Sequence, residues 1–144
     1  MTRFIHLTDL HISHPGSPDP SDKSGAVETL RRVVQVINAM ERQPAFVVAS
    51  GDLTNMGDAD SYRLLQEILK PLAPPLVMAL GNHDKRAPFH EVLGNAGSDA
   101  PYFHDVVHGG MHVITLDTMK PGHVAGTICD AQFDFLAHAL SRHS

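Results

Sequence analysis

Three short apolar runs alternate with two amphipathic segments over the first 80 residues. The runs are residues 3–8, 45–50 and 75–80. Short continuous apolar runs bounded by turn residues are typical of strands buried in a parallel sheet. Between them, residues 26–42 and 59–70 repeat apolar side chains at i, i+3, i+4 and i+7, which predicts two helices. The order β-α-β-α-β with short connections predicts a parallel sheet and an α/β fold.

The predicted inward positions are Ala26, Val27, Leu30, Val33, Val34, Ile37 and Met40 in the first helix, and Tyr62, Leu65, Ile68 and Leu69 in the second. After residue 100 the pattern changes. Residues 101–107 and 111–117 flank His108-Gly109-Gly110, which predicts a β-hairpin or a closely spaced strand pair. Residues 130–141 predict a last helix, with Phe133, Leu136, Ala137 and Leu140 on its inward face. No repeat or interdomain linker interrupts residues 1–144, so we expect a single domain.

Composition and charge narrow the classes of function. The chain has 144 residues, a net charge of −5 with histidine neutral, and no Lys/Arg cluster of the kind that binds a nucleic-acid polymer. No apolar stretch reaches the ~18–20 residues of a membrane helix, and the N-terminus does not resemble a signal peptide. Cys129 is the sole cysteine, so we expect a reducing, cytoplasmic setting. The 11 histidines raise the question of metal binding.

Each predicted parallel strand ends in a polar cluster. The clusters are Asp9-Leu10-His11, Gly51-Asp52-Leu53-Thr54 and Gly81-Asn82-His83-Asp84. Ligands of open parallel sheets bind just beyond the carboxyl ends of the strands. We therefore expect the three clusters to converge at one edge of the sheet, where the glycines let the backbone turn sharply beside a ligand.

The residue types in these clusters favour a metal site. Aspartate and asparagine supply oxygen ligands and histidine supplies nitrogen, a mixture that suits Zn, Mn or Fe. Asp9 and His11 lie two residues apart and can chelate one ion. Asp52 is a carboxylate that can bridge two ions, and Asn82 offers a neutral oxygen. Two neighbouring ions can generate hydroxide near neutral pH and neutralise charge on a phosphoryl group.

Histidines near the expected site can contact a substrate. His83 can donate a hydrogen bond or a proton to a phosphoryl or leaving-group oxygen, with Asp84 or another carboxylate orienting it. His14 lies close enough in the chain to be a candidate substrate contact. His123 follows a Pro-Gly pair in a loop that can also reach a substrate. A plain surface position remains the alternative for His14 and His123.

The motifs D-L-H, G-D-L-T and G-N-H-D, in that order and each after an apolar strand, resemble the signature of the calcineurin-like metallophosphoesterases. TDLHIS and ALGNHD resemble most the bacterial branch of cyclic-nucleotide phosphodiesterases and glycerophosphodiesterases. The resemblance implies that Asp9 and His11 bind a first metal and that Asp52 bridges to a second. It also implies that Asn82 binds the second metal and that His83 is a catalytic histidine that binds none.

Members of that family also carry later histidines in H-H-x-P and G-H-x-H contexts, which complete both metal shells. The chain contains neither motif, so we expect the N-terminal part of an αββα sandwich with an incomplete second metal site. Either the chain is a fragment of a longer protein, or it is a short natural form that another chain completes or that is inactive. Missing strands of the second sheet predict uncovered apolar surface and self-association.

The resemblance implies hydrolysis of a small phosphodiester such as 3′,5′-cyclic AMP, with two ions of Fe, Mn or Zn as cofactors. The alternative is a non-catalytic module of the same fold that acts as a protein-interaction scaffold. Metal content distinguishes the two, since two tightly bound ions favour the enzyme and one weak ion or none favours the scaffold.

Overall fold

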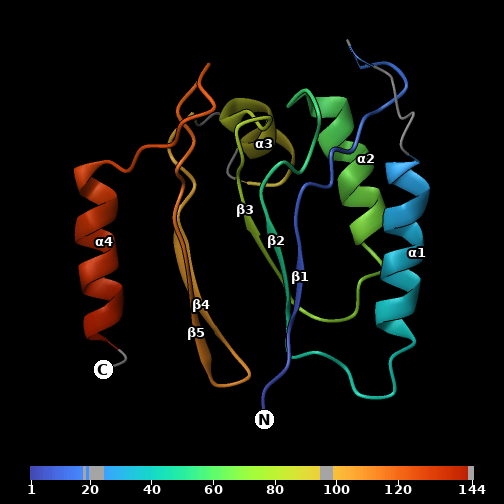
Figure 1. The fold of residues 1–144 in the computed structure, drawn as a ribbon, viewed down its shortest axis with the longest axis horizontal. Coiled ribbons are helices and arrows are strands. Elements are labelled where there is room, and N and C mark those ends of the chain that lie inside the picture. The colour runs from blue at the N-terminus through green and yellow to red at the C-terminus, as the bar shows by residue number, and fades with distance from the viewer. Residues whose placement is uncertain (18, 20–24, 95–98, 143–144) are drawn as a thin grey trace.

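The computed structural model describes residues 1–17, 19, 25–94 and 99–142. In chain order the elements are β1 (Ile5–Leu7), α1 (Ala26–Asn38), β2 (Val47–Ser50), α2 (Ala59–Leu69), β3 (Leu76–Ala79), α3 (Arg86–Val92), β4 (His104–His108), β5 (Met111–Thr115) and α4 (Asp130–Ser141). Figure 1 shows their arrangement. In the described part of the chain, no helix is both long enough and apolar enough to cross a membrane.

The first three strands form the predicted parallel sheet. Its order is β1-β2-β3, and the register pairs Ile5 with Val47 and Val47 with Leu76. An isolated parallel bridge between Ile12 and Thr54 continues the alignment beyond the strand ends. The β-α-β-α-β prediction is confirmed, and all three strands run toward the same edge of the sheet.

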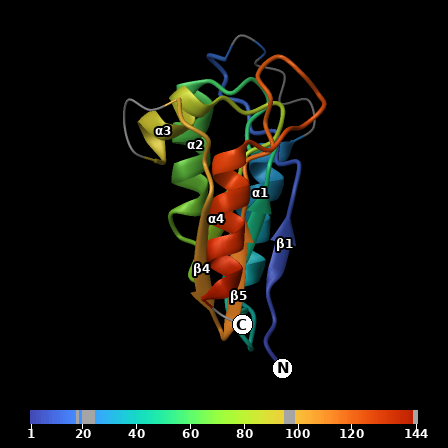
Figure 2. The same ribbon diagram turned by 90° about the vertical axis from the view of Figure 1, so that its left-hand side faces the viewer.

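The elements pack as helix, sheet, sheet and helix layers. Figure 1 shows α1 and α2 on one side of the parallel sheet, the β4–β5 hairpin on the other side, and α4 outside the hairpin; Figure 2 shows α4 in front of the hairpin. This order agrees with the expected αββα arrangement. The core lies chiefly between α1, α2 and the parallel sheet, and buried members are Leu30, Val34, Ala49, Tyr62, Leu65, Ile68 and Phe89.

The predicted hairpin is confirmed. β4 and β5 pair antiparallel from His104 opposite Thr115 to His108 opposite Met111. Gly109 and Gly110 form the turn with φ of 58° and 77°, the left-handed conformation that a two-residue hairpin loop requires. Thr2 Oγ1 donates to the carbonyl of Gly109 at 2.8 Å, which ties the hairpin tip to the start of the chain.

The helix predicted over 26–42 ends earlier, at Asn38. Gln43 explains the early end, because its Nε2 donates to the carbonyls of Ile37, Asn38 and Met40 at 3.0–3.2 Å. Helix-terminal carbonyls need such partners when the backbone ladder stops. The sequence did not predict α3, which is short and carries Pro88 in its first turn, a position that tolerates proline.

The predicted inward face of α4 is wrong. Phe133 and Leu140 are each 55% exposed, whereas Gln132 and Ala139 are buried. The helix is turned by an anchor that periodicity cannot reveal: the main-chain N–H of Asp117 donates to Gln132 Oε1 at 2.7 Å, and Gln132 Nε2 donates to the Asp117 carbonyl at 2.9 Å. A polar side chain therefore faces inward while part of the apolar stripe faces outward.

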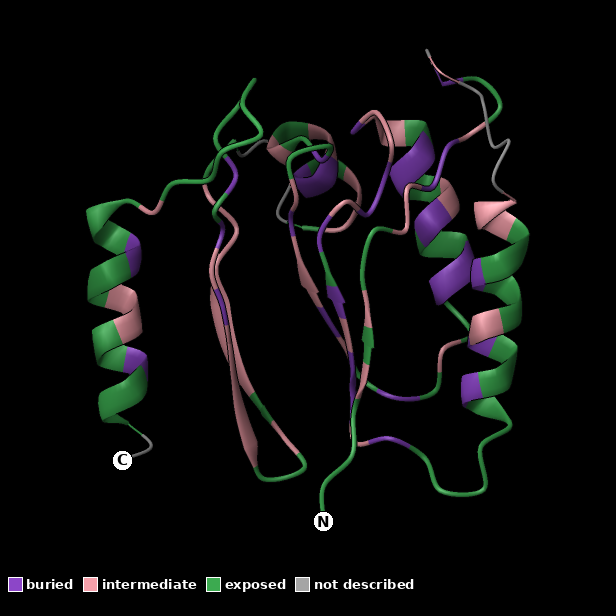
Figure 3. Cartoon of the chain, viewed as in Figure 1, coloured by how far each residue is buried: buried purple, intermediate pink, exposed green. Residues whose placement is uncertain are grey.

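Figure 3 shows that most of the outer surface of α4 is exposed. Large apolar side chains that are exposed in the described part of the chain include Phe4, Val36, Val107, Phe133 and Leu140. Phe4 precedes β1, Val36 lies on α1, Val107 on the hairpin, and Phe133 and Leu140 on α4. Their exposure agrees with the expectation of uncovered apolar surface. Self-association through these positions remains a prediction.

Candidate metal and substrate site

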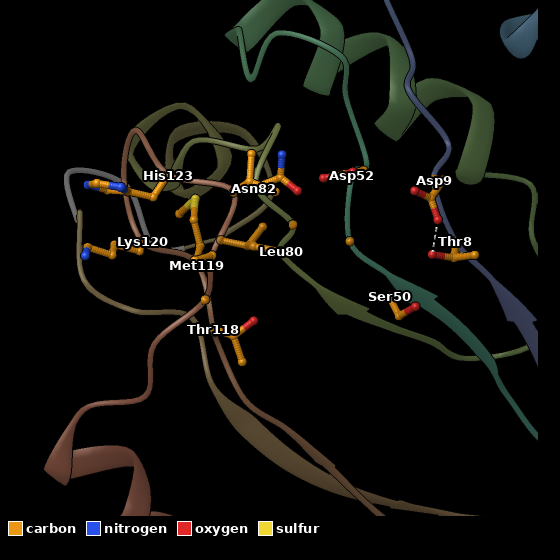
Figure 4. A pocket seen from close by; sticks show the side chains of 15 residues that line it. Thr8, Asp9, Ser50, Asp52, Leu80, Asn82, Thr118, Met119, Lys120 and His123 are labelled. Carbon is orange, nitrogen blue, oxygen red and sulfur yellow. Dashed lines mark hydrogen bonds between the residues drawn. The ribbon is translucent and has the colours of Figure 1, made fainter.

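The carboxyl ends of β1 and β2 bring three metal-binding side chains together. One ligand atom each from Asp9, His11 and Asp52 lies within 4.8 Å of the others. Figure 4 shows Asp9, Asp52 and Asn82 following three neighbouring strands of the sheet. The predicted convergence of the polar clusters is therefore present in the fold.

The backbone at these three residues is unusual. Asp9, His11 and Asp52 have φ of 54°, 46° and 47°, and they are the non-glycine residues with positive φ in the described part of the chain. Such left-handed conformations cost about 1–3 kcal/mol each and cluster at functional sites. Hydrogen bonds across the two loops, from Asp9 N to Gly51 O at 3.2 Å and from His11 N to Asp52 O at 2.9 Å, hold them in place.

The side-chain geometry fits a bound cation. His11 Nε2 lies 3.9 Å from Asp9 Oδ1 and 3.8 Å from Asp52 Oδ2, too far for hydrogen bonds. Atoms that bind one ion at about 2.0–2.2 Å are separated by roughly 3–4 Å, which matches these distances. Two carboxylates and an imidazole also form the mixed oxygen and nitrogen ligand set that transition metals accept. These residues therefore suit an ion of that class.

Gly81 lies directly against Asp52. A Cβ atom added to Gly81 would overlap both the carboxylate and the main-chain nitrogen of Asp52. Gly51 is also close, because its Cβ would lie 3.0 Å from the Cα of Gly81. Gly51 has a φ of 97°, as the predicted sharp turn requires, whereas Gly81 allows the loops after β2 and β3 to approach each other.

We expect Gly81→Ala to weaken metal binding about 10- to 100-fold, because the added methyl group pushes the Asp52 carboxylate out of position. Calorimetric titration with Mn²⁺ measures the affinity. Gly110→Ala, in the hairpin turn, is the control for a general loss of stability: its Cβ meets nothing within 4 Å, but an alanine at its φ of 77° is strained, and we expect its Mn²⁺ affinity to stay unchanged. An unchanged Mn²⁺ affinity in Gly81→Ala would remove Asp52 from the site.

Asp84 is a buried hub that joins the loops after β2 and β3. Its carboxylate accepts from the main-chain N–H groups of Leu53 and Thr54 at 3.1 Å and of Gly81 at 2.9 Å, and from the Tyr62 hydroxyl at 2.9 Å. Leu53 follows Asp52 and Gly81 precedes Asn82 in the chain. Asp84 therefore fixes the backbone on which two of the predicted ligands stand.

Burial governs the electrostatics of this hub. It raises the pKa of the Asp84 carboxyl above its ordinary value, while hydrogen bonds from Gly81, Leu53 and Tyr62 act in the opposite direction. Burial also raises the pKa of the Tyr62 phenol, and the charge of Asp84 adds to that effect. Tyr62 therefore keeps its proton and acts as a donor to Asp84.

The ring of His83 is oriented by a main-chain carbonyl, in contrast to the expectation that Asp84 or another carboxylate orients it. His83 Nδ1 lies 2.9 Å from the carbonyl of Asn55, and the His83 N–H donates to Asp52 Oδ1 at 3.0 Å. A carbonyl only accepts, so Nδ1 carries the proton and Nε2 is left for a substrate. The rings of His11 and His83 meet edge to face with centroids 4.7 Å apart, which places His83 beside the metal cluster.

A cavity of about 270 Å³ opens beside the cluster. Asp9, Asp52 and Asn82 line one side, and Figure 4 shows Lys120 and His123 on the other side. These two residues belong to the loop between β5 and α4. From the sequence, His123 was either a plain surface residue or a substrate contact, and in the structure it lines the cavity. The sequence did not indicate Lys120, because an isolated lysine in a loop carries no motif.

A buried ion pair holds the base of that loop. Arg86 donates to Asp117 through Nε at 2.8 Å and Nη2 at 3.2 Å, and Nη2 also donates to the carbonyl of Met119 at 2.7 Å. The N–H groups of Tyr102 and Met119 satisfy the same carboxylate at 2.7 and 2.9 Å. The loop is closed by a hydrogen bond from Thr127 N to Thr118 O at 2.9 Å. Its position over the cavity is therefore well defined.

His14 lies apart from this cavity. Its main-chain N–H donates to Ser61 Oγ at 2.9 Å, and its Nδ1 accepts from Gly16 N at 3.0 Å. It is not among the residues that line the cavity beside Asp52 and Asn82. A substrate contact by His14 therefore remains a prediction that this geometry does not favour.

Known proteins resemble the chain along most of its length. A probable cyclic nucleotide phosphodiesterase of Rhodococcus erythropolis is 36% identical over 143 residues, which cover 96% of this chain and 47% of that protein. The 3′,5′-cyclic adenosine monophosphate phosphodiesterase CpdA of Pseudomonas aeruginosa is 32% identical over 139 residues, covering 94% and 50%. The glycerophosphodiester phosphodiesterase GpdQ of Enterobacter lignolyticus is 31% identical over 114 residues, covering 76% and 41%.

These relatives include cyclic-nucleotide phosphodiesterases and a glycerophosphodiester phosphodiesterase, the two kinds of enzyme that the motifs resemble. The chain spans about half the length of the curated relatives that it matches. A family profile described as calcineurin-like phosphoesterase matches residues 2–134, which include the three strand-end clusters and the loop over the cavity. The chain belongs to the calcineurin-like phosphoesterase family.

Proposed function

We propose that this chain carries the metal-binding part of a phosphodiesterase that hydrolyses a small phosphodiester, with 3′,5′-cyclic AMP as the leading candidate. The observation that carries the proposal is the meeting of Asp9, His11 and Asp52 within 4.8 Å, all three in strained left-handed conformations. The relatives named for cyclic-nucleotide phosphodiesterase activity support the choice of substrate.

Each residue has a defined part in this proposal. Asp9 and His11 would hold a first ion, Asp52 would be shared with a second, and Asn82 would hold the second, with Mn, Fe and Zn all compatible with these atoms. Such a pair of ions supplies positive charge that acidifies a water molecule and offsets the charge of the phosphoryl group. His83 would present Nε2 toward the leaving oxygen and, in the doubly protonated imidazolium form, give it the Nε2 proton, while the Asn55 carbonyl keeps the ring in place through Nδ1–H.

A scaffold without catalysis is the second candidate. Among the described residues, the carboxylate, imidazole and thiol groups that meet at one point are Asp9, His11 and Asp52, enough for one ion. The exposed Phe133 and Leu140 of α4 offer apolar surface for a partner. One weakly bound ion per chain and no hydrolysis would favour this candidate.

Replacing Asp52 tests the proposed site. We expect Asp52→Ala to lose bound Mn²⁺ and to lower hydrolysis of bis(p-nitrophenyl) phosphate more than about 100-fold, because Asp52 would be a ligand of both ions and its carboxylate accepts from the His83 N–H. Metal content by mass spectrometry and release of p-nitrophenol are the measurements. Asp134→Ala, on the exposed surface of α4, is the control. Intact metal content and hydrolysis in Asp52→Ala would refute the assignment.

A further inference from the structure

A second and larger cavity adjoins the first. Its volume is about 570 Å³, and it lies between α3 and the loop after β5. Asn82 and Met119 line both cavities, so the two meet at the predicted second-metal ligand. Figure 4 labels both residues among the side chains that line the smaller cavity. A ligand whose phosphorus lies near Asn82 can therefore extend in two directions.

Part of the wall of the larger cavity is aliphatic. Ala87, Pro88, Met119 and Pro121 contribute aliphatic surface. Two of its ionic side chains are already engaged. Asp84 accepts from Leu53, Thr54, Gly81 and Tyr62, and the Arg86 guanidinium is held by Asp117 and by the carbonyl of Met119. Lys85 and Asp99 also line the cavity, but both are exposed and can stay hydrated. The aliphatic part of the lining therefore favours a flat apolar group over a strongly hydrated one.

His83 connects the larger cavity to the reaction. It lines this cavity but not the smaller one. Its Nδ1 is occupied by the carbonyl of Asn55, so Nε2 is the atom that serves a leaving oxygen. An oxygen that accepts a proton from His83 would therefore lie beside the larger cavity. The smaller cavity, beside Asp9, Lys120 and His123, is the polar one.

We propose that the larger cavity binds the arm of the phosphodiester that carries the leaving oxygen, and that this arm bears an aromatic ring. The inference rests on the proposed function, since it places the phosphorus beside Asn82. It narrows the substrate class to phosphodiesters with an aryl or nucleobase ring on the leaving-oxygen side. A glycerol arm, which is small and hydrated, leaves the apolar walls uncovered.

Binding of two phosphate compounds tests this subsite. Calorimetry of the Mn²⁺-loaded chain with inorganic phosphate reports the metal site alone, and phenyl phosphate adds the ring. We expect phenyl phosphate to bind on the order of tenfold more tightly, because its ring leaves water for an apolar wall. Ala87→Leu fills the cavity from the exposed side of α3 and removes this preference while phosphate affinity stays unchanged. Ala137→Leu, on the exposed surface of α4, keeps the preference.

The outcomes separate the subsite from the proposed function. Equal affinities of the unaltered chain for phosphate and phenyl phosphate would overturn the ring subsite while the metal site stands. A preference that survives Ala87→Leu would overturn its location between α3 and the loop. If neither compound binds to the Mn²⁺-loaded chain, the proposed function fails and the subsite fails with it.

Discussion

Asp84→Ala is expected to lower the free energy of unfolding by about 4 kcal/mol or more. The substitution leaves the N–H groups of Leu53, Thr54 and Gly81 and the Tyr62 hydroxyl without their shared acceptor. Each buried donor that loses its partner costs about 1–3 kcal/mol. Urea unfolding followed by circular dichroism measures the change, and metal affinity is expected to fall in the same variant because the loops that carry Asp52 and Asn82 separate.

Two further variants test whether the loss of stability comes from the burial of the Asp84 hydrogen bonds. Asp60 also accepts hydrogen bonds, from Arg63 at 2.7 Å, but both side chains are more than half exposed. Asp60→Ala is therefore expected to change stability by less than about 1 kcal/mol. Tyr62→Phe removes one of the donors to Asp84 and is expected to cost about 1–3 kcal/mol. A stability loss in Asp84→Ala no larger than that of Asp60→Ala would show that the hub does not hold the loops.

The parallel sheet could be predicted because its signals are local. Apolar runs and 3.6-residue periodicity identified β1 to β3 and α2, where the predicted Tyr62, Leu65, Ile68 and Leu69 are all buried. The face of α4 could not be predicted in the same way. Its orientation depends on Gln132 binding the main chain of Asp117, 15 residues earlier, and such a contact leaves no trace in the helix periodicity.

In the site, too, the residues with local sequence signals could be predicted and the long-range contacts that support them could not. Three strands that end in polar clusters predicted that Asp9, His11, Asp52 and Asn82 would converge, because parallel strands share an edge. The supporting contacts could not be read from the motifs. Asp84 stands next to His83 in the chain but turns its carboxylate toward Leu53 and Thr54, 31 and 30 residues away. The carbonyl that orients His83 belongs to Asn55, 28 residues away, and any residue type supplies a carbonyl.

The support of His83 by main-chain atoms makes its role separable from metal binding. Its main-chain N–H donates to Asp52 Oδ1, and the residue lines the larger cavity. An alanine at position 83 keeps the N–H. Replacing the side chain therefore removes the proton donor and leaves the carboxylate in place. Few substitutions beside a metal site offer this separation.

His83→Ala is accordingly expected to retain its bound Mn²⁺ and to lose activity. Removal of a positioned proton donor lowers kcat about 10²- to 10⁴-fold. The measurements are metal content by mass spectrometry and kcat for bis(p-nitrophenyl) phosphate. His138→Ala, in the exposed last turn of α4, should match the unaltered chain in both. If His83→Ala instead releases the metal together with the activity, His83 is a ligand. If it keeps both, leaving-group protonation lies elsewhere, and the larger cavity loses its link to the reaction.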